Sequence, residues 1–200
     1  MNLTLEPIRY PRSIMTGLMI EQADSEILEM LRDPARKDAG FLKLMENFKR
    51  PVYWHIRRLV LSHEDAEDIL QETFIQVYRH IGTFRGECKL FTWLYRIATN
   101  ECTKHFRKNK HRKAQTGSEN LEVSGELAGT DAEESKAILI KFQNAILQLP
   151  EKQRIVFNMR YYDELSYEEM GQILHSSVSS LKTNFHYASE KIKRYLIDHA

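Results

Sequence analysis

Apolar and polar side chains alternate with a helical period along two long stretches of the chain, separated by a polar segment at 114–135. In the first stretch the apolar positions begin at Phe41 and recur every three or four residues as far as Val60. Pro51 lies inside this pattern and cannot donate a backbone hydrogen bond, so we expect a kink or a helix restart there.

The most regular predicted helix follows Ser62. Ser62 and Asp65 have the spacing of a capping box, in which each side chain accepts a hydrogen bond from the other residue's backbone N–H. The apolar stripe behind them comprises Ala66, Ile69, Leu70, Thr73, Phe74, Val77, Tyr78 and Ile81. Asp65, Asp68 and Glu72 share a second, acidic face. That face is either a surface for a basic partner or a solvated helix flank favoured by the helix dipole.

Residues 82–89 contain two glycines and no period, which predicts a loop before another helix. The inward positions of that helix are Leu94, Ile97, Ala98 and Phe106. Residues 96–113 carry seven basic side chains and one acidic one, Glu101. The nearby aromatic residues are Phe84, Phe91, Trp93 and Tyr95. Aromatic rings beside cations are typical of sites that bind unpaired nucleic acid, and a loop between glycines could bring a strand to Phe84 and Arg85. Alternatively, the aromatic rings belong to the hydrophobic core and the charged side chains form a solvated helix end. For Trp93 taken alone, a core position is the favoured interpretation.

Residues 114–135 have no aromatic or basic side chain and are rich in Gly, Ser and Thr. Such a segment cannot bury enough apolar surface to offset its ordering entropy. We therefore predict a flexible acidic linker that joins two small helical domains.

The second stretch predicts a helix-turn-helix. A helix begins at about Ser135, and Pro150 suits the first turn of the next one. Ser166 and Glu169 form a second capping box before a short helix, and residues 175–177 separate it from a longer helix. The inward positions are Ile138, Phe142, Ala145, Ile146 and Leu149, then Ile155, Val156 and Met159, then Met170, Ile173 and Leu174, and finally Val178, Leu181, Phe185, Ala188, Ile192 and Leu196.

The outer face of the last helix presents Ser179, Ser180, Lys182, Thr183, His186 and Tyr187. Hydroxyl groups near a helix N-terminus can donate to phosphates or base edges, and Lys182 adds positive charge. A plain three-helix bundle with a solvated outer face would produce the same pattern, so the pattern alone leaves both interpretations open.

The overall charge hides an uneven distribution. The 200 residues include 29 Lys and Arg and 28 Asp and Glu, a net charge of +1 that argues against nucleic-acid binding. By segment, however, residues 21–113 carry 18 basic and 14 acidic side chains, residues 114–135 carry none and 6, and residues 136–200 carry 9 and 7. Two basic blocks are therefore balanced by the acidic segment between them.

Composition excludes several other classes of protein. Only 8 Gly and 5 Pro favour helices over a turn-rich β fold. Cys88 and Cys102 form no C-x-x-C pair, which argues against a zinc module or a secreted disulfide framework. No apolar run reaches the roughly 18 residues of a membrane span, so we expect a cytoplasmic protein without direct membrane insertion. Paired carboxylates exist, but no nearby His or Cys completes a metal or nucleophile set, and the sequence contains no glycine loop of the kind that cradles phosphate. We therefore expect no enzyme, cofactor, metal or small-molecule substrate.

These segments follow one another in the same order as the conserved regions of a known protein family. The run SHEDAEDILQETFIQVYRHIGTFRGECKLFTWLYRIATNECTKHFRK resembles region two of bacterial RNA polymerase sigma factors of the extracytoplasmic-function (ECF) group. The run LPEKQRIVFNMRYYDELSYEEMGQILHSSVSSLKTNFHYASEKIKRYL resembles region four. The resemblance covers about 41–108 and 136–196. It implies an all-α chain with an unassigned leader (1–20), a region-two domain (21–113), the linker (114–135) and a region-four domain (136–200).

The resemblance also implies roles for individual residues. Core-polymerase binding falls on Asp65, Asp68, Gln71 and Glu72. Recognition and melting of the −10 element fall on Phe84, Arg85, Phe91, Trp93, Arg96, Thr99, Asn100, Lys104 and Arg107. Recognition of the −35 element falls on Ser179, Ser180, Lys182, Thr183, Asn184, His186 and Tyr187. The implied partners are core RNA polymerase, promoter DNA and an anti-sigma factor.

The chain departs from the family pattern at a few positions. His175 stands where the family commonly has a turn glycine, and Asn184 and Tyr187 stand where it often has arginine. The leader matches nothing in the family, which makes Met15 or Met19 an alternative start. Two other classes stay open: a regulator that binds an operator without polymerase, and a helical adaptor without DNA contact.

Overall fold

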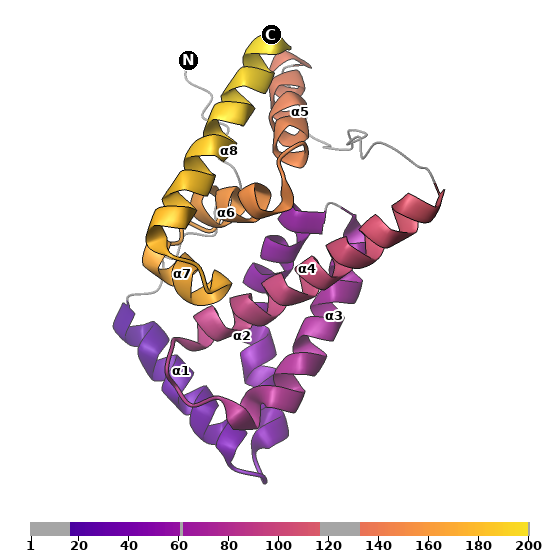
Figure 1. The fold of residues 1–200 in the computed structure, drawn as a ribbon. Helices are drawn as coiled ribbons and strands as arrows, with labels where there is room; N and C mark the ends of the chain where they lie inside the picture. Colours follow the sequence, from indigo (N-terminus) through magenta and orange to yellow (C-terminus); the bar gives the residue numbers. More distant parts are fainter. Residues whose placement is uncertain (1–16, 61, 117–132, 200) are drawn as a thin grey trace. The chain divides into compact units, whose positions relative to one another are not determined.

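The computed structural model describes residues 17–60, 62–116 and 133–199, with side chains described for 24–60, 62–110 and 138–199. All the regular elements among these residues are helices and none is a strand, as the sequence predicts (Figure 1). They form two compact units, one built mainly on α1 to α4 and the other mainly on α5 to α8.

The first unit contains α1 (Gly17–Arg32), α2 (Lys37–Val60), α3 (His63–His80), the short 3₁₀ helix η2 (Ile81–Thr83) and α4 (Leu90–Thr116) as far as Phe106. Helix α1 was not predicted as a helix. Its residues 17–20 belong to the predicted leader, the rest of which lies outside the described residues. Helix α2 runs through Pro51 without a restart and begins before Phe41.

The apolar stripes of α2 and α3 build the core of the first unit. Leu44, Val52, Ile56 and Leu59 of α2 are fully buried, and Ala66 and Val77 of α3 are buried with them. Tyr78, which the stripe placed inward, is instead 38% exposed. Helix α1 lies so close to α2 at Gly40 that a Cβ atom built there would be 2.8 Å from Met30 Cβ.

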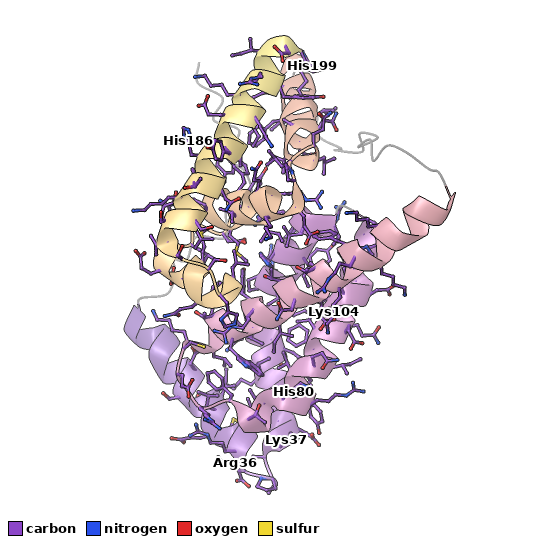
Figure 2. All side chains as sticks on the ribbon, viewed as in Figure 1. Arg36, Lys37, His80, Lys104, His186 and His199 are labelled. Carbon is purple, nitrogen blue, oxygen red and sulfur yellow. The ribbon has the colours of Figure 1, made fainter. Side chains whose placement is uncertain are left out.

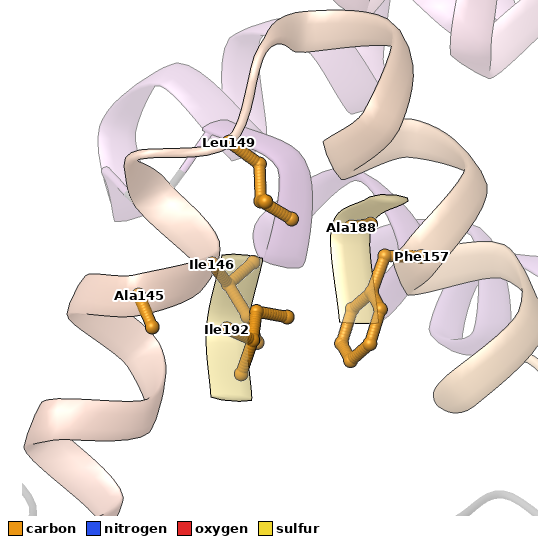
Figure 3. Packing of buried hydrophobic residues seen from close by; sticks show 6 residues of the cluster. All are labelled: Ala145, Ile146, Leu149, Phe157, Ala188 and Ile192. Carbon is orange, nitrogen blue, oxygen red and sulfur yellow. The ribbon is translucent and has the colours of Figure 1, made fainter. Parts of the chain in front are cut away.

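The second unit contains α5 (Glu133–Leu147), α6 (Glu151–Tyr161), α7 (Tyr167–Leu174) and α8 (Val178–Asp198). Its core cluster joins α5, α6 and α8 through Ala145, Ile146, Leu149, Phe157, Ala188 and Ile192 (Figure 3). The Phe157 ring stacks on Phe185 with centroids 5.7 Å apart. Ile138 is 57% exposed, so its predicted inward position is wrong.

The predicted linker lies mostly outside the described residues. Its first three residues, 114–116, are the end of α4, and its last three, 133–135, are the beginning of α5. Among the residues that the structure describes, no helix is both long enough and apolar enough to cross a membrane.

Candidate functional surfaces

The predicted acidic face of α3 divides into two flanks. Ser62 caps the helix, its Oγ accepting from the Asp65 backbone N–H at 3.2 Å. The Asp65 carboxylate lies 3.5 Å from His105 Nε2 of α4. Glu72 is half-buried and accepts a 2.6 Å hydrogen bond from Gln76. These two carboxylates are therefore already engaged within the unit.

Asp68 and Gln71 lie on the other flank and are exposed. They line a groove of about 530 Å³ between α2 and α3. Its other lining residues include Phe41, Met45, Lys49, Ile75 and Tyr78. Asp68 lies one turn before Glu72 on α3, so the two flanks are adjacent, and the groove adds apolar side chains beside the exposed pair.

The loop between α3 and α4 places its aromatic side chains differently from the expectation. Phe84 is only 8% exposed and packs on Trp93 with ring centroids 5.3 Å apart. The expectation that Phe84 is open to an approaching strand is therefore wrong for this conformation. Arg85 is exposed, and Trp93 is half-buried. Gly86 has φ +79°, a left-handed value that glycine adopts without steric cost.

The basic residues of α4 lie mostly toward solvent. Asn100, Lys104 and Arg107 are exposed, and Arg96 is half-buried. The Lys104 ammonium lies 2.7 Å from the Glu101 carboxylate, and its side chain projects away from the helix (Figure 2). Thr99 is an exception, since it is 3% exposed and bonds to His55. Direct contact of Thr99 with DNA is therefore not possible in this conformation.

The sequence did not single out His55, which is 1% exposed and lies between α2 and α4. The sequence around His55 does not indicate a hydrogen bond to α4, because its partner Thr99 is 44 residues away. Phe91 is half-buried on the first turn of α4, with its ring centroid 4.0 Å from that of Tyr95.

The helix-turn-helix forms as predicted. Ser166 and Glu169 make both hydrogen bonds of a capping box at the start of α7. His175 ends α7 in the left-handed conformation, φ 50° and ψ 45°, which is the conformation that a glycine at this place in a helix end commonly adopts. Ser177 then caps α8 by accepting from the Ser180 N–H at 3.2 Å.

The predicted reading face of α8 is open. Ser179, Ser180, Lys182, Thr183, His186 and Tyr187 are exposed, and Asn184 is half-buried. His186 projects from the outer side of the helix (Figure 2). The Thr183 hydroxyl donates to Ser179 O at 3.0 Å, and Asn184 Nδ2 donates to Ser180 O at 2.8 Å. These bonds hold both side chains along the helix while leaving acceptor oxygens outward.

Two family models match the chain: Sigma-70 region 2 over residues 44–112, and Sigma-70, region 4 over residues 139–192. The chain is 35% identical over 168 residues to the ECF RNA polymerase sigma factor SigW of Bacillus subtilis, covering 80% of this chain and 90% of that protein. It is 29% identical over 184 residues to the ECF RNA polymerase sigma-E factor of Escherichia coli, covering 87% and 95%.

Solved structures share the fold. The sigma factor RpoE of Bartonella quintana, in complex with the anti-sigma factor NepR, matches with a TM-score of 0.66 at 21% identity, covering 78% of this chain and 96% of that one. CnrH in complex with the cytosolic domain of CnrY matches with a TM-score of 0.64 at 16% identity, covering 89% and 99%. Both sequence blocks, the helical fold and the similarity to SigW agree, and the chain belongs to the ECF RNA polymerase sigma factor family.

Proposed function

We propose that this chain binds core RNA polymerase, gives it promoter specificity and promotes promoter melting. The observation that carries the proposal is the 35% identity to an ECF sigma factor over 80% of the chain. The open reading face of α8 and the exposed cations of α4 supply the two kinds of DNA contact that this function needs. The protein acts by binding alone, in the cytoplasm, and transforms no substrate.

Core polymerase binds at the groove between α2 and α3. Asp68 and Gln71 offer polar contacts at its edge, and Ile75 and Met45 offer apolar area. A groove of this kind accepts a helix that presents apolar and basic side chains. Glu72 and Asp65 border this surface from the α4 side and contribute mainly through their charge.

Region four binds duplex DNA through α8. Lys182 and Thr183 are exposed on its second turn, and Leu181 beneath them is 2% exposed and fixes the helix on the unit. Phosphate contacts by Lys182 orient the helix, and the hydroxyl and amide groups of Thr183 and Asn184 discriminate bases. Since the family's arginines are absent at Asn184 and Tyr187, fewer phosphates are contacted there.

Region two binds the melted strand through Arg85, Phe91, Trp93 and the cations of α4. An unpaired base stacks on an aromatic ring while the cations hold the backbone. Phe84 supports Trp93 from the core rather than contacting the base.

An anti-sigma factor controls the protein. Among the structures that share its fold, RpoE was solved with the anti-sigma factor NepR and CnrH with the cytosolic domain of CnrY, which supports this part of the proposal. Occupation of a polymerase-binding surface by the partner would keep the factor silent.

The decisive experiment is reconstitution of run-off transcription with core polymerase on genomic templates, with the transcripts mapped. Specific start sites that depend on the added chain support the proposal. A gel shift by the free protein that is strongly salt-dependent, without added transcription, would favour the operator-binding regulator. Absence of both activities would favour the adaptor.

Charge reversal at Asp68 and Glu72 to Lys should weaken binding to core by on the order of tenfold or more, because like charges replace complementary ones. Glu29→Lys is the matched control, since Glu29 is exposed on α1 away from the groove. Wild-type affinity of the double variant would reject this assignment.

Replacing Lys182 and Thr183 with Ala should weaken or relax −35 recognition, because one phosphate contact and one base-edge contact are lost. Lys191→Ala removes an exposed charge farther along α8 and serves as the control. Unchanged footprints in the double variant would contradict the assigned reading face.

A further inference from the structure

Four residues tie consecutive turns of α2 to consecutive turns of α4. The Tyr95 hydroxyl donates to Pro51 O at 3.3 Å, and His55 Nε2 lies 3.0 Å from Thr99 Oγ1. Each pair on one helix is spaced by four residues and therefore shares a face. His55, Tyr95 and Thr99 are between 1% and 3% exposed. The two helices are thus joined by side-chain hydrogen bonds inside the core.

The hydrogen bonds of Thr99 fix the proton of His55. The Thr99 hydroxyl has one proton, which it donates to Tyr95 O at 2.7 Å. The same oxygen must therefore accept the hydrogen bond from His55, so the imidazole carries its proton on Nε2. Removing the hydroxyl would leave a buried N–H without this acceptor, which is costly inside a protein.

The aromatic ring of Phe91 rests on this unit. Its centroid is 4.0 Å from that of Tyr95 at an interplanar angle of 33°, and the Tyr95 ring is also 4.5 Å from the His55 ring. Phe91 is half-buried in the first turn of α4, directly after the loop at 84–89. Phe91 is the half-buried ring of a stack whose other members, Tyr95 and His55, are buried and hydrogen-bonded.

We infer that His55, Tyr95 and Thr99 are positioning residues that hold Phe91 as the stacking platform for an unpaired base of the melted promoter. A ring that is already fixed gains stacking energy without the entropy cost of ordering a mobile side chain. The buried unit therefore determines how well the half-buried Phe91 ring binds a base, although none of its three members touches DNA. This inference rests on the proposed function.

The test is a coupling measurement between protein and DNA. The affinity of the holoenzyme is measured for promoter fragments whose −10 segment is single-stranded. One fragment has every base, and each of the others has a single base removed to leave an abasic site. For the wild type we expect one position at which base removal weakens binding by about tenfold, within the range of base–aromatic stacking. Phe91→Ala should abolish that dependence.

Thr99→Val keeps the shape of the side chain but removes the hydroxyl. We expect base removal to weaken its binding by less than about threefold at the same position, and Thr99→Ser to restore the dependence to about tenfold. A role in stability alone would change binding to intact and abasic fragments by the same factor, so the ratio between the two fragments separates the roles.

Circular dichroism establishes that each variant is folded. Should Thr99→Val unfold, Tyr95→Phe decides, because it keeps both rings in place and removes the hydroxyl that bonds to Pro51 O; a reduced base dependence is expected. An unchanged ratio in the folded variants would overturn the inference, as would full base dependence in Phe91→Ala or none in the wild type. Failure of the wild-type chain to bind core or open a duplex promoter would instead overturn the proposed function.

Discussion

The turn between α7 and α8 allows a quantitative prediction about a single backbone angle. His175 has φ 50° and ψ 45°, and its N–H bonds to Gly171 O. A left-handed conformation costs an ordinary L-residue about 1–2 kcal/mol. Glycine avoids this cost but loses about 0.5–1 kcal/mol more in chain entropy on folding. His175→Gly should therefore be more stable than His175→Ala by about 0.5–1 kcal/mol. Both variants remove the imidazole, so their difference isolates the backbone.

Hydrogen exchange of the α7 and α8 amides measures this difference directly. The amides that exchange through opening of the second unit should be protected about 2- to 5-fold more in the Gly variant than in the Ala variant. Both tryptophans, Trp54 and Trp93, lie in the first unit, so their fluorescence during unfolding serves as an internal control and should be unchanged. Equal protection in the two variants, or greater protection with Ala, would refute the reasoning.

Three further changes test local features. Ser166→Ala removes the cap of α7 and should destabilise the second unit by about 1 kcal/mol, measured by chemical denaturation followed by circular dichroism. Gly40→Ala places a Cβ against α1, where the nearest side-chain atom is 2.8 Å away, and should lower the stability of the first unit by about 1–3 kcal/mol in tryptophan fluorescence. The hydrogen bond from Arg36 lowers the pKa of Asp33. The ionised carboxylate therefore stabilises the folded state at pH values above the ordinary pKa of a carboxyl group, and this stabilisation is lost as the pH falls through the lowered pKa. Arg36→Gln should return that pKa toward 3.8 in an NMR titration.

Local patterns predicted those elements whose signals lie within a few residues of each other. The stripe behind Ser62 identified α3, and its buried positions from Ala66 to Val77 are those expected. The capping box of Ser166 and Glu169 identified the start of α7. In both cases a cap and a period of 3.6 residues agree, and neither requires a distant partner.

Contacts between distant residues could not be predicted in this way. Phe84 lies between Gly82 and Gly86 and looks like a loop residue, yet it is buried because Trp93 of the next helix packs on it. Ile138 has the period of a buried residue but lies in α5 where the other helices of its unit leave it exposed. Helix α1 did carry a signal, Ile27 and Leu31 at a spacing of four residues, and both are buried.

The geometry of α4 explains why a role assigned by motif can shift from contact to support. Arg96, Asn100, Lys104 and Arg107 are spaced by four, four and three residues, so they fall on one side of the helix, where Asn100, Lys104 and Arg107 are exposed and Arg96 is half-buried. Thr99 is adjacent in sequence but lies on the flank that faces α2, where it meets His55. A motif records which positions matter without distinguishing the two sides of a helix. Under the proposed function, the exposed residues of this stripe contact the promoter strand, and Thr99 acts on that strand only through the rings it holds.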